Sequence, residues 1–140
     1  MKREYDFSKA RRGPVVSIDN LEGLHAMRIT VIGRGNVGGG LARQWTTAGH
    51  KVTALGREGG DAQGADVVLI AVPGDAIADG LAKVRGLGGQ VTIDATNTFS
   101  AYPAGFDSLA QQVKSIVGGL TAKAFNNCYT QNCVGAKSVD

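Results

Sequence analysis

Residues 28–38 read RITVIGRGNVG, and this stretch decides the fold. Residues 28–32 have the length and the apolar content of a buried strand. The sequence then carries glycines at 33, 35 and 38, and residues 36–48 have a helical composition that ends before Gly49, a residue suited to a left-handed C-cap. This glycine spacing is a weak signal alone. Placed between a strand and a helix, it indicates a loop that binds the phosphates of a dinucleotide.

The three glycines have separate predicted roles. Gly33 permits a tight turn, Gly35 lets the backbone approach a pyrophosphate, and Gly38 lets the helix pack closely on the sheet. The N–H groups of the loop and the positive end of the helix then attract phosphate. The alternative is a glycine-rich turn without a ligand.

The rest of the chain alternates apolar runs of strand length with helical patterns, which is typical of an α/β fold with a parallel sheet. The run at 66–72 is the most apolar, so we place it at the centre of a doubly wound sheet covered by helices on both faces. Asp75 is available to cap the helix after it. The remaining predicted elements are strands at 51–55, 90–94 and 121–125 and helices at 75–85 and 106–116.

We expect one domain at 27–127, between a basic arm or linker at 1–26 and a tail at 128–140. Residues 1–12 hold five basic and two acidic side chains, a net charge of +3 that equals the charge of the 140-residue chain. A solvated arm explains this charge, so we do not expect nucleic-acid binding. The longest apolar run, 67–73, is too short to span a bilayer, and we expect no membrane association.

Neither a metal site nor a redox-active thiol pair is predicted. Cys128 and Cys133 lack the C-x-x-C spacing, and the two histidines, His25 and His50, are distant from them in the sequence. Because no signal peptide is recognisable, we expect free thiols and a cytoplasmic location.

The end of the second predicted strand indicates which dinucleotide would bind. An NAD site usually carries an acidic residue there, which binds the ribose hydroxyls. Here Leu55 is followed by Gly56 and Arg57, and a guanidinium favours the 2′-phosphate of NADP. Arg34 could reach the same phosphate. Glu58 is evidence to the contrary, because a small shift of the strand end would bring a carboxylate to the ribose.

No catalytic side chain is predicted. Hydride transfer between a nicotinamide and a flavin-like ring needs no proton donor, whereas carbonyl reduction needs an acid. Tyr102 and Lys123 are the available acids, but Tyr102 is better explained by loop packing. Lys123 fits a phosphate or substrate contact and an exposed structural lysine equally well. Thr96 and Asn97 follow a strand whose end should open onto the ligand crevice, and a simple turn at Asn97 is the alternative.

Residues 27–127 resemble the NADP-binding domain of the coenzyme F420-dependent NADP oxidoreductase family. The matching segments, in the family's order, are MRITVIGRGNVGGGLARQWTTAGHKV, LGRE, ADVVLIAVP, VTIDATN and TAKAFNN. The resemblance implies a Rossmann NAD(P)-binding fold, NADP as cofactor, and hydride transfer between NADPH and a flavin-like or deazaflavin (F420) acceptor.

The resemblance also implies individual roles. The pyrophosphate loop corresponds to Gly33, Arg34, Gly35, Asn36 and Val37. The 2′-phosphate contacts correspond to Gly56 and Arg57, where Gly56 replaces a hydroxyl residue and Arg34 could compensate. The ribose lining corresponds to Ala71, Val72 and Pro73, and the nicotinamide contacts to Ala95, Thr96 and Asn97. Residues 123–126 match the edge of the substrate side.

Family members continue past this last segment with elements that complete the second-cofactor site and a dimer contact. We therefore expect a chain without the C-terminal part, which either acts on a small hydride acceptor, alone or as a homodimer, or is a non-catalytic NADP-binding module working through a partner. A third hypothesis is DNA contact through the arm, because YDFSKARRGPVV resembles the leader of some ribbon-helix-helix antitoxins.

Overall fold

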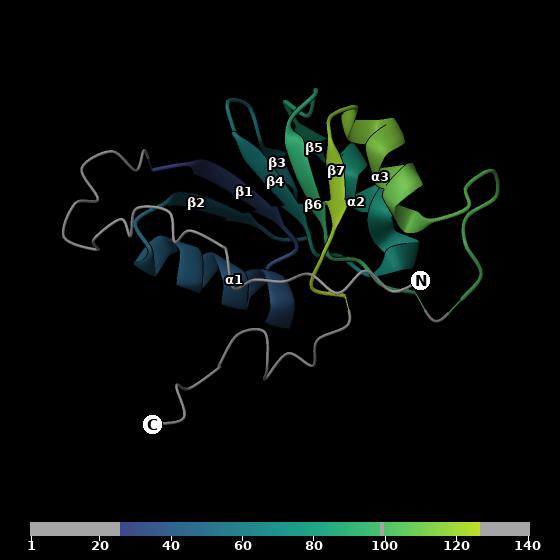
Figure 1. The fold of residues 1–140 in the computed structure, drawn as a ribbon, viewed down its shortest axis with the longest axis horizontal. Helices are drawn as coiled ribbons and strands as arrows, with labels where there is room; N and C mark the ends of the chain where they lie inside the picture. Colours follow the sequence, from purple (N-terminus) through teal and green to yellow (C-terminus); the bar gives the residue numbers. More distant parts are fainter. Residues whose placement is uncertain (1–25, 99, 127–140) are drawn as a thin grey trace, which may run out of the picture.

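The computed structural model describes residues 26–98 and 100–126, and Figure 1 shows their arrangement. The predictions for the arm, the tail, His25, Cys128 and Cys133 lie outside these residues. The elements are β1 (Arg28–Ile32), α1 (Asn36–Thr47), β2 (Lys51–Leu55), β3 (Gly60–Asp61), β4 (Val67–Ile70), the 3-10 turn η3 (Gly74–Ala76), α2 (Ile77–Ala82), β5 (Val84–Arg85), β6 (Val91–Asp94), α3 (Leu109–Val117) and β7 (Thr121–Lys123).

Five strands form one parallel sheet in the order β2-β1-β4-β6-β7. The apolar strand β4 lies at its centre, as predicted. From β1 the chain proceeds to one edge of the sheet, and from β4 it proceeds to the other edge. The neighbouring strands β1 and β4 therefore form the topological switch point, where open α/β sheets bind ligands at the carboxyl ends of their strands.

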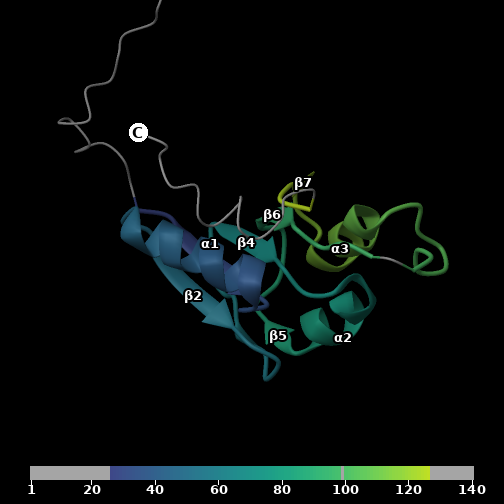
Figure 2. The same ribbon diagram turned by 90° about the horizontal axis from the view of Figure 1, so that it is seen from below.

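Helices cover both faces of this sheet, so the doubly wound prediction is confirmed (Figure 2). Successive strand residues point to opposite faces. On one face Val31 and Leu69 pack with Leu41 of α1. On the other face the next residues, Ile32 and Ile70, join a second core cluster with α2 and α3. This second cluster includes Ile77, Leu81, Val113 and Val117.

The helix predicted at 75–85 is shorter and differently bounded. A 3-10 turn precedes α2, no side chain caps either segment, and Asp75 is therefore not the predicted cap. The helix ends at Ala82 because the following residues, Val84–Arg85, pair in parallel with Gly60–Asp61 as a separate two-stranded sheet. This pairing joins residues 24 positions apart and leaves no local pattern in the sequence.

Other helix and strand boundaries differ from the predicted ones because of interactions at the ends of these elements. The last helix begins at Leu109 instead of residue 106, because the Ser108 hydroxyl accepts the Gln111 N–H at 3.2 Å and caps the helix. Strand β7 ends at Lys123, before Phe125 adopts a positive φ of 65°. Gly49 has the predicted left-handed backbone, with φ 95°, but it lies one residue beyond the C-cap of α1, which is Ala48. None of the helices within 26–98 and 100–126 combines the length and apolar character needed to cross a membrane.

Candidate functional site

Three loops meet at the carboxyl ends of β1, β2 and β4 and surround one open cavity of about 550 Å³. A cavity of this size lies within the range of small-molecule sites. Its lining consists of Gly33, Arg34, Gly35, Gly56, Arg57, Glu58, Ala71, Val72 and Pro73. The structure thus brings together eight predicted site residues from three separate parts of the sequence, and adds Glu58.

The turn after β1 is held tightly against the end of β4. Gly33 has φ 99°, its N–H donates to the Leu55 carbonyl at 2.9 Å, and a Cβ there would collide with the carbonyl group of Ala71. A Cβ on Gly38 would collide with the Gly33 carbonyl and would lie 3.1 Å from the Ala71 Cβ. The predicted tight turn at Gly33 and close packing at Gly38 are therefore confirmed.

Gly35 borders open space. Its φ of −75° suits any residue, and an added Cβ would meet no atom within 4 Å. Gly35 is also the N-cap of α1, which has no side-chain cap and no acidic residue in its first turn. The positive end of this helix is therefore not neutralised by a carboxylate of its own first turn. Asn36, Val37 and Gly38 form that turn and are not among the residues that line the cavity.

Two arginines and one acid give the cavity its charge. The Arg34 and Glu58 side chains form an ion pair at 3.1 Å and are both largely exposed. The pKa of Glu58 is lowered, mainly by backbone hydrogen bonding at Glu58 itself; partial desolvation opposes this effect, and Arg34 and the backbone at Gly56 reinforce it. In the part of the chain that the structure describes, the exposed Arg57 guanidinium has no ion-pair partner.

The residues predicted beside the nicotinamide lie next to this cavity and do not line it. Asn97 lines a smaller hollow of about 300 Å³ together with Tyr102 and Lys123. The Gly74 N–H donates to the Asn97 carbonyl at 3.0 Å, which joins the loops after β4 and β6. The Asn97 Oδ1 accepts the Thr98 N–H at 3.0 Å, so its side chain contributes to a local turn, the alternative interpretation from the sequence.

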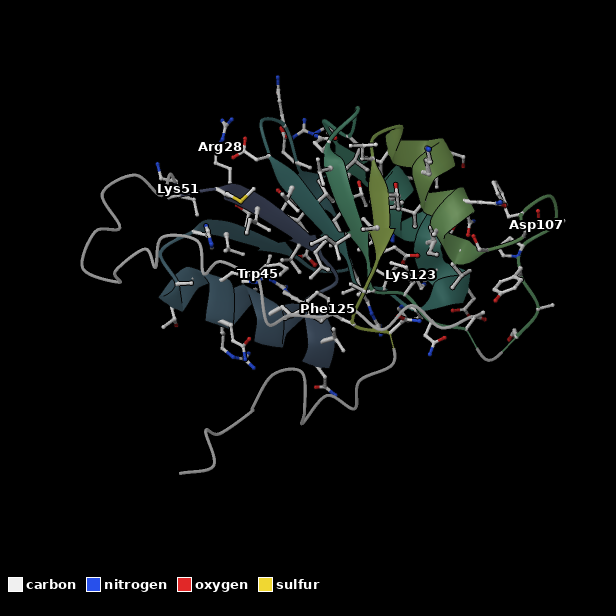
Figure 3. All side chains as sticks on the ribbon, viewed as in Figure 1. Arg28, Trp45, Lys51, Asp107, Lys123 and Phe125 are labelled. Atoms are coloured by element: carbon white, nitrogen blue, oxygen red, sulfur yellow. The ribbon has the colours of Figure 1, made fainter. Side chains whose placement is uncertain are left out.

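Below this hollow lies a polar cluster that the sequence analysis missed. Asp94 is fully buried at the end of β6, and its carboxylate accepts the Thr96 hydroxyl at 2.6 Å. The Lys123 ammonium lies 2.9 Å from the other carboxylate oxygen and also donates to the Thr96 carbonyl. Figure 3 shows Lys123 at the carboxyl end of β7. One sequence signal could have revealed this cluster: an acidic residue ends an apolar strand and is followed two positions later by a threonine. Acidic and hydroxyl side chains at such positions form local turns.

Lys123 is therefore an ion-paired structural lysine on an exposed strand end, which agrees with the second interpretation from the sequence. The other candidate acids also lie away from the main cavity. Tyr102 is 56% exposed, so the packing role favoured for it is wrong. His50 accepts the Met27 N–H at 3.2 Å, at the amino end of the sheet. Within residues 26–98 and 100–126, no cluster of His, Cys, Asp or Glu is arranged to hold a metal ion.

Comparison with known proteins identifies the fold. A protein from Arthrobacter sp. FB24 that carries the provisional name F420-dependent NADP reductase aligns with a TM-score of 0.58 and 22% identity, over 76% of this chain and 65% of its own. A hypothetical protein from Sinorhizobium meliloti aligns with a TM-score of 0.54 and 28% identity, over 79% of this chain and 66% of its own. Neither a family model nor a curated protein matches the sequence. The chain has the Rossmann-type fold and spans about two thirds of these neighbours.

The Asp94–Lys123 pair should stabilise the ends of β6 and β7. We expect Lys123→Met to lower the free energy of unfolding by about 2 kcal/mol, because it leaves a buried carboxylate without its cation; the lysine's partial exposure keeps the effect below that of a fully buried pair. Urea unfolding measures the change. Lys51→Met, at an exposed strand residue, is the control, and an equal effect of the two substitutions would contradict this role.

Proposed function

We propose that this chain binds NADP(H) in the cavity at the ends of β1, β2 and β4 and transfers hydride between NADPH and a flavin-like or deazaflavin (F420) acceptor. One observation carries the proposal: a turn with glycine at 33 and 35, an uncapped helix terminus and an unpaired arginine converge on one open space at the switch point of the sheet. Phosphates bind at such termini, because backbone N–H groups and the helix dipole both attract them.

The residues present fit the parts of this cofactor. The backbone at Arg34 and Gly35 would hold the pyrophosphate, because both residues line the cavity and the space over Gly35 is open. Arg57, with Arg34, would hold the 2′-phosphate, since guanidinium groups bind phosphate through paired hydrogen bonds. The ribose would lie along Ala71, Val72 and Pro73. Beside the nicotinamide we place Ala95 and Asn97, whereas Thr96 is buried with its hydroxyl donated to Asp94 and would act only by holding this loop.

When bound, NADPH would supply the hydride, and the protein would position the ring. The lining of the cavity includes no histidine, tyrosine or lysine. This composition is compatible with transfer between two stacked rings, which requires no proton donor from the protein. The provisional name of the Arthrobacter neighbour supports an F420-type acceptor by analogy of fold. A cytosolic location and a homodimer stay predictions from the sequence.

Filling the open space over Gly35 should abolish binding without disturbing the fold. We expect Gly35→Val to reduce NADPH and NADH affinity at least a hundredfold, because the side chain would project into the pyrophosphate position. The control is Gly88→Val, where an added Cβ also meets no atom within 4 Å. Calorimetric titration measures affinity, and thermal unfolding confirms that both variants fold. Unchanged binding by a folded Gly35→Val would contradict the assigned site.

Arg57 should select the phosphorylated dinucleotide. We expect Arg57→Ala to weaken NADPH binding about tenfold, since an exposed guanidinium contributes a modest charge-assisted interaction, and to leave NADH affinity nearly unchanged. Arg43→Ala on α1 is the matched control, because Arg43 lies outside the cavity lining. Equal losses for the two dinucleotides would remove Arg57 from 2′-phosphate recognition.

A non-catalytic NADP-binding module acting through a partner is the second candidate. It is favoured by the small size of the hollow beside Asn97 and by the engagement of its lysine with Asp94. A steady-state assay of NADPH oxidation with FMN and with F420 separates the candidates. We expect saturable NADPH oxidation with at least one of the two acceptors. The Gly35→Val variant should show no such oxidation. Tight NADPH binding without turnover would instead favour the module.

A further inference from the structure

Glu58 lies beside the two arginines that the proposed function assigns to the 2′-phosphate. Its carboxylate is 3.1 Å from the Arg34 guanidinium, and both side chains line the cavity beside Arg57. Glu58 projects from the loop that follows β2, the loop that selects between dinucleotides in this fold. The carboxylate thus pairs with one of the two arginines assigned above to the 2′-phosphate.

The ion pair occupies the space that a side chain at residue 56 would enter. A Cβ on Gly56 would lie 2.6 Å from a carboxylate oxygen of Glu58 and 2.8 and 2.9 Å from two guanidinium nitrogens of Arg34. Each distance is too short for a real Cβ. Glycine at 56 therefore leaves room for the ion pair to form directly over the loop.

The backbone around the carboxylate also favours an anion. The pKa of Glu58 is lowered first by backbone hydrogen bonding at Glu58, and further by Arg34 and by the backbone at Gly56, against a smaller opposing effect of desolvation. The side chain is therefore ionised at neutral pH. Guanidinium and backbone N–H groups are also the donors that hold phosphate groups in proteins.

We propose that Glu58 is an internal competitor of the 2′-phosphate: without nucleotide its carboxylate occupies Arg34, and the phosphate of NADP(H) displaces it. This inference rests on the proposed function and adds a specificity-determining residue to it. A phosphate monoester carries more negative charge than a carboxylate and binds a guanidinium through two hydrogen bonds, so it can displace the acid. NADH has only ribose hydroxyls at this position and leaves the ion pair intact.

Because of this competition, Glu58 affects the affinity for NADPH and not the affinity for NADH. Breaking an exposed ion pair requires little free energy, so the competitor lowers NADPH affinity moderately without preventing binding. The opposite role is also chemically reasonable, because a carboxylate at this position can bind the ribose hydroxyls of NAD(H). The two roles predict opposite effects of removing the charge of Glu58.

The experiment compares dissociation constants for NADPH and NADH in four proteins: wild type, Glu58→Gln, Arg34→Gln and the double variant. We expect Glu58→Gln to tighten NADPH binding roughly three- to tenfold and to change NADH binding less than twofold. The double-variant cycle isolates the interaction between the two residues. In the Arg34→Gln background this gain in NADPH affinity should disappear, because Glu58 then has no Arg34 guanidinium to occupy.

Asp107→Asn is the control for the loss of one negative charge. Asp107 lies in the loop before α3, away from the cavity lining, and is labelled in Figure 3. This variant should leave both dissociation constants unchanged.

Each other outcome has a distinct meaning. If the gain from Glu58→Gln persists in the Arg34→Gln background, Glu58 only repels the phosphate and the competitor proposal is wrong. If Glu58→Gln weakens NADH binding, the carboxylate binds ribose hydroxyls and the proposal is again wrong. If NADPH binds the wild type and Glu58→Gln binds it equally well, only this inference fails. If the wild type binds neither dinucleotide, the proposed function fails as well.

Discussion

The close contact between the turn at Gly33 and the end of β4 is the constraint on which the site depends. Neither Gly33 nor Gly38 can carry a Cβ, because the carbonyl groups of Ala71 and Gly33 lie in the way. Without these side chains, α1 begins immediately above the sheet, and its amino terminus opens onto the space between the loops after β2 and β4. A side chain at either position would push the helix away from the sheet and separate the groups that line the cavity.

Two ion pairs at the carboxyl edge of the sheet differ in a way that suits their positions. The Arg34–Glu58 pair is exposed and bridges adjacent loops, so a ligand can separate it at small energetic expense. The Asp94–Lys123 pair has a fully buried acid that also accepts a hydroxyl hydrogen bond, so separating it leaves an unpaired charge in the interior. A ligand can rearrange the first pair, while the second joins the ends of β6 and β7.

Whether a feature could be predicted from the sequence depends on how far apart its interacting residues lie along the chain. The main strands, the glycine turn and the central position of β4 depend on local composition and on short spacings, and each was predicted. The β3–β5 pairing was not, because two-residue strands have no periodicity and their partners are 24 positions apart. The same limit applies to Asp94 and Lys123, 29 positions apart, and to the pairing of Arg34 with Glu58. For the site, the sequence indicated which loops converge but not which charges meet there.

A titration of the uniformly ¹⁵N-labelled chain with NADP⁺, followed by backbone amide chemical shifts, tests the central claim most directly. The account predicts saturable shifts at Gly33, Gly35 and Asn36, together with Gly56 and Arg57, and little change at Arg43 on the outer surface of α1. Shifts confined to the hollow between Asn97 and Lys123, or no saturable shifts at all, would contradict nucleotide binding at the switch point of the sheet.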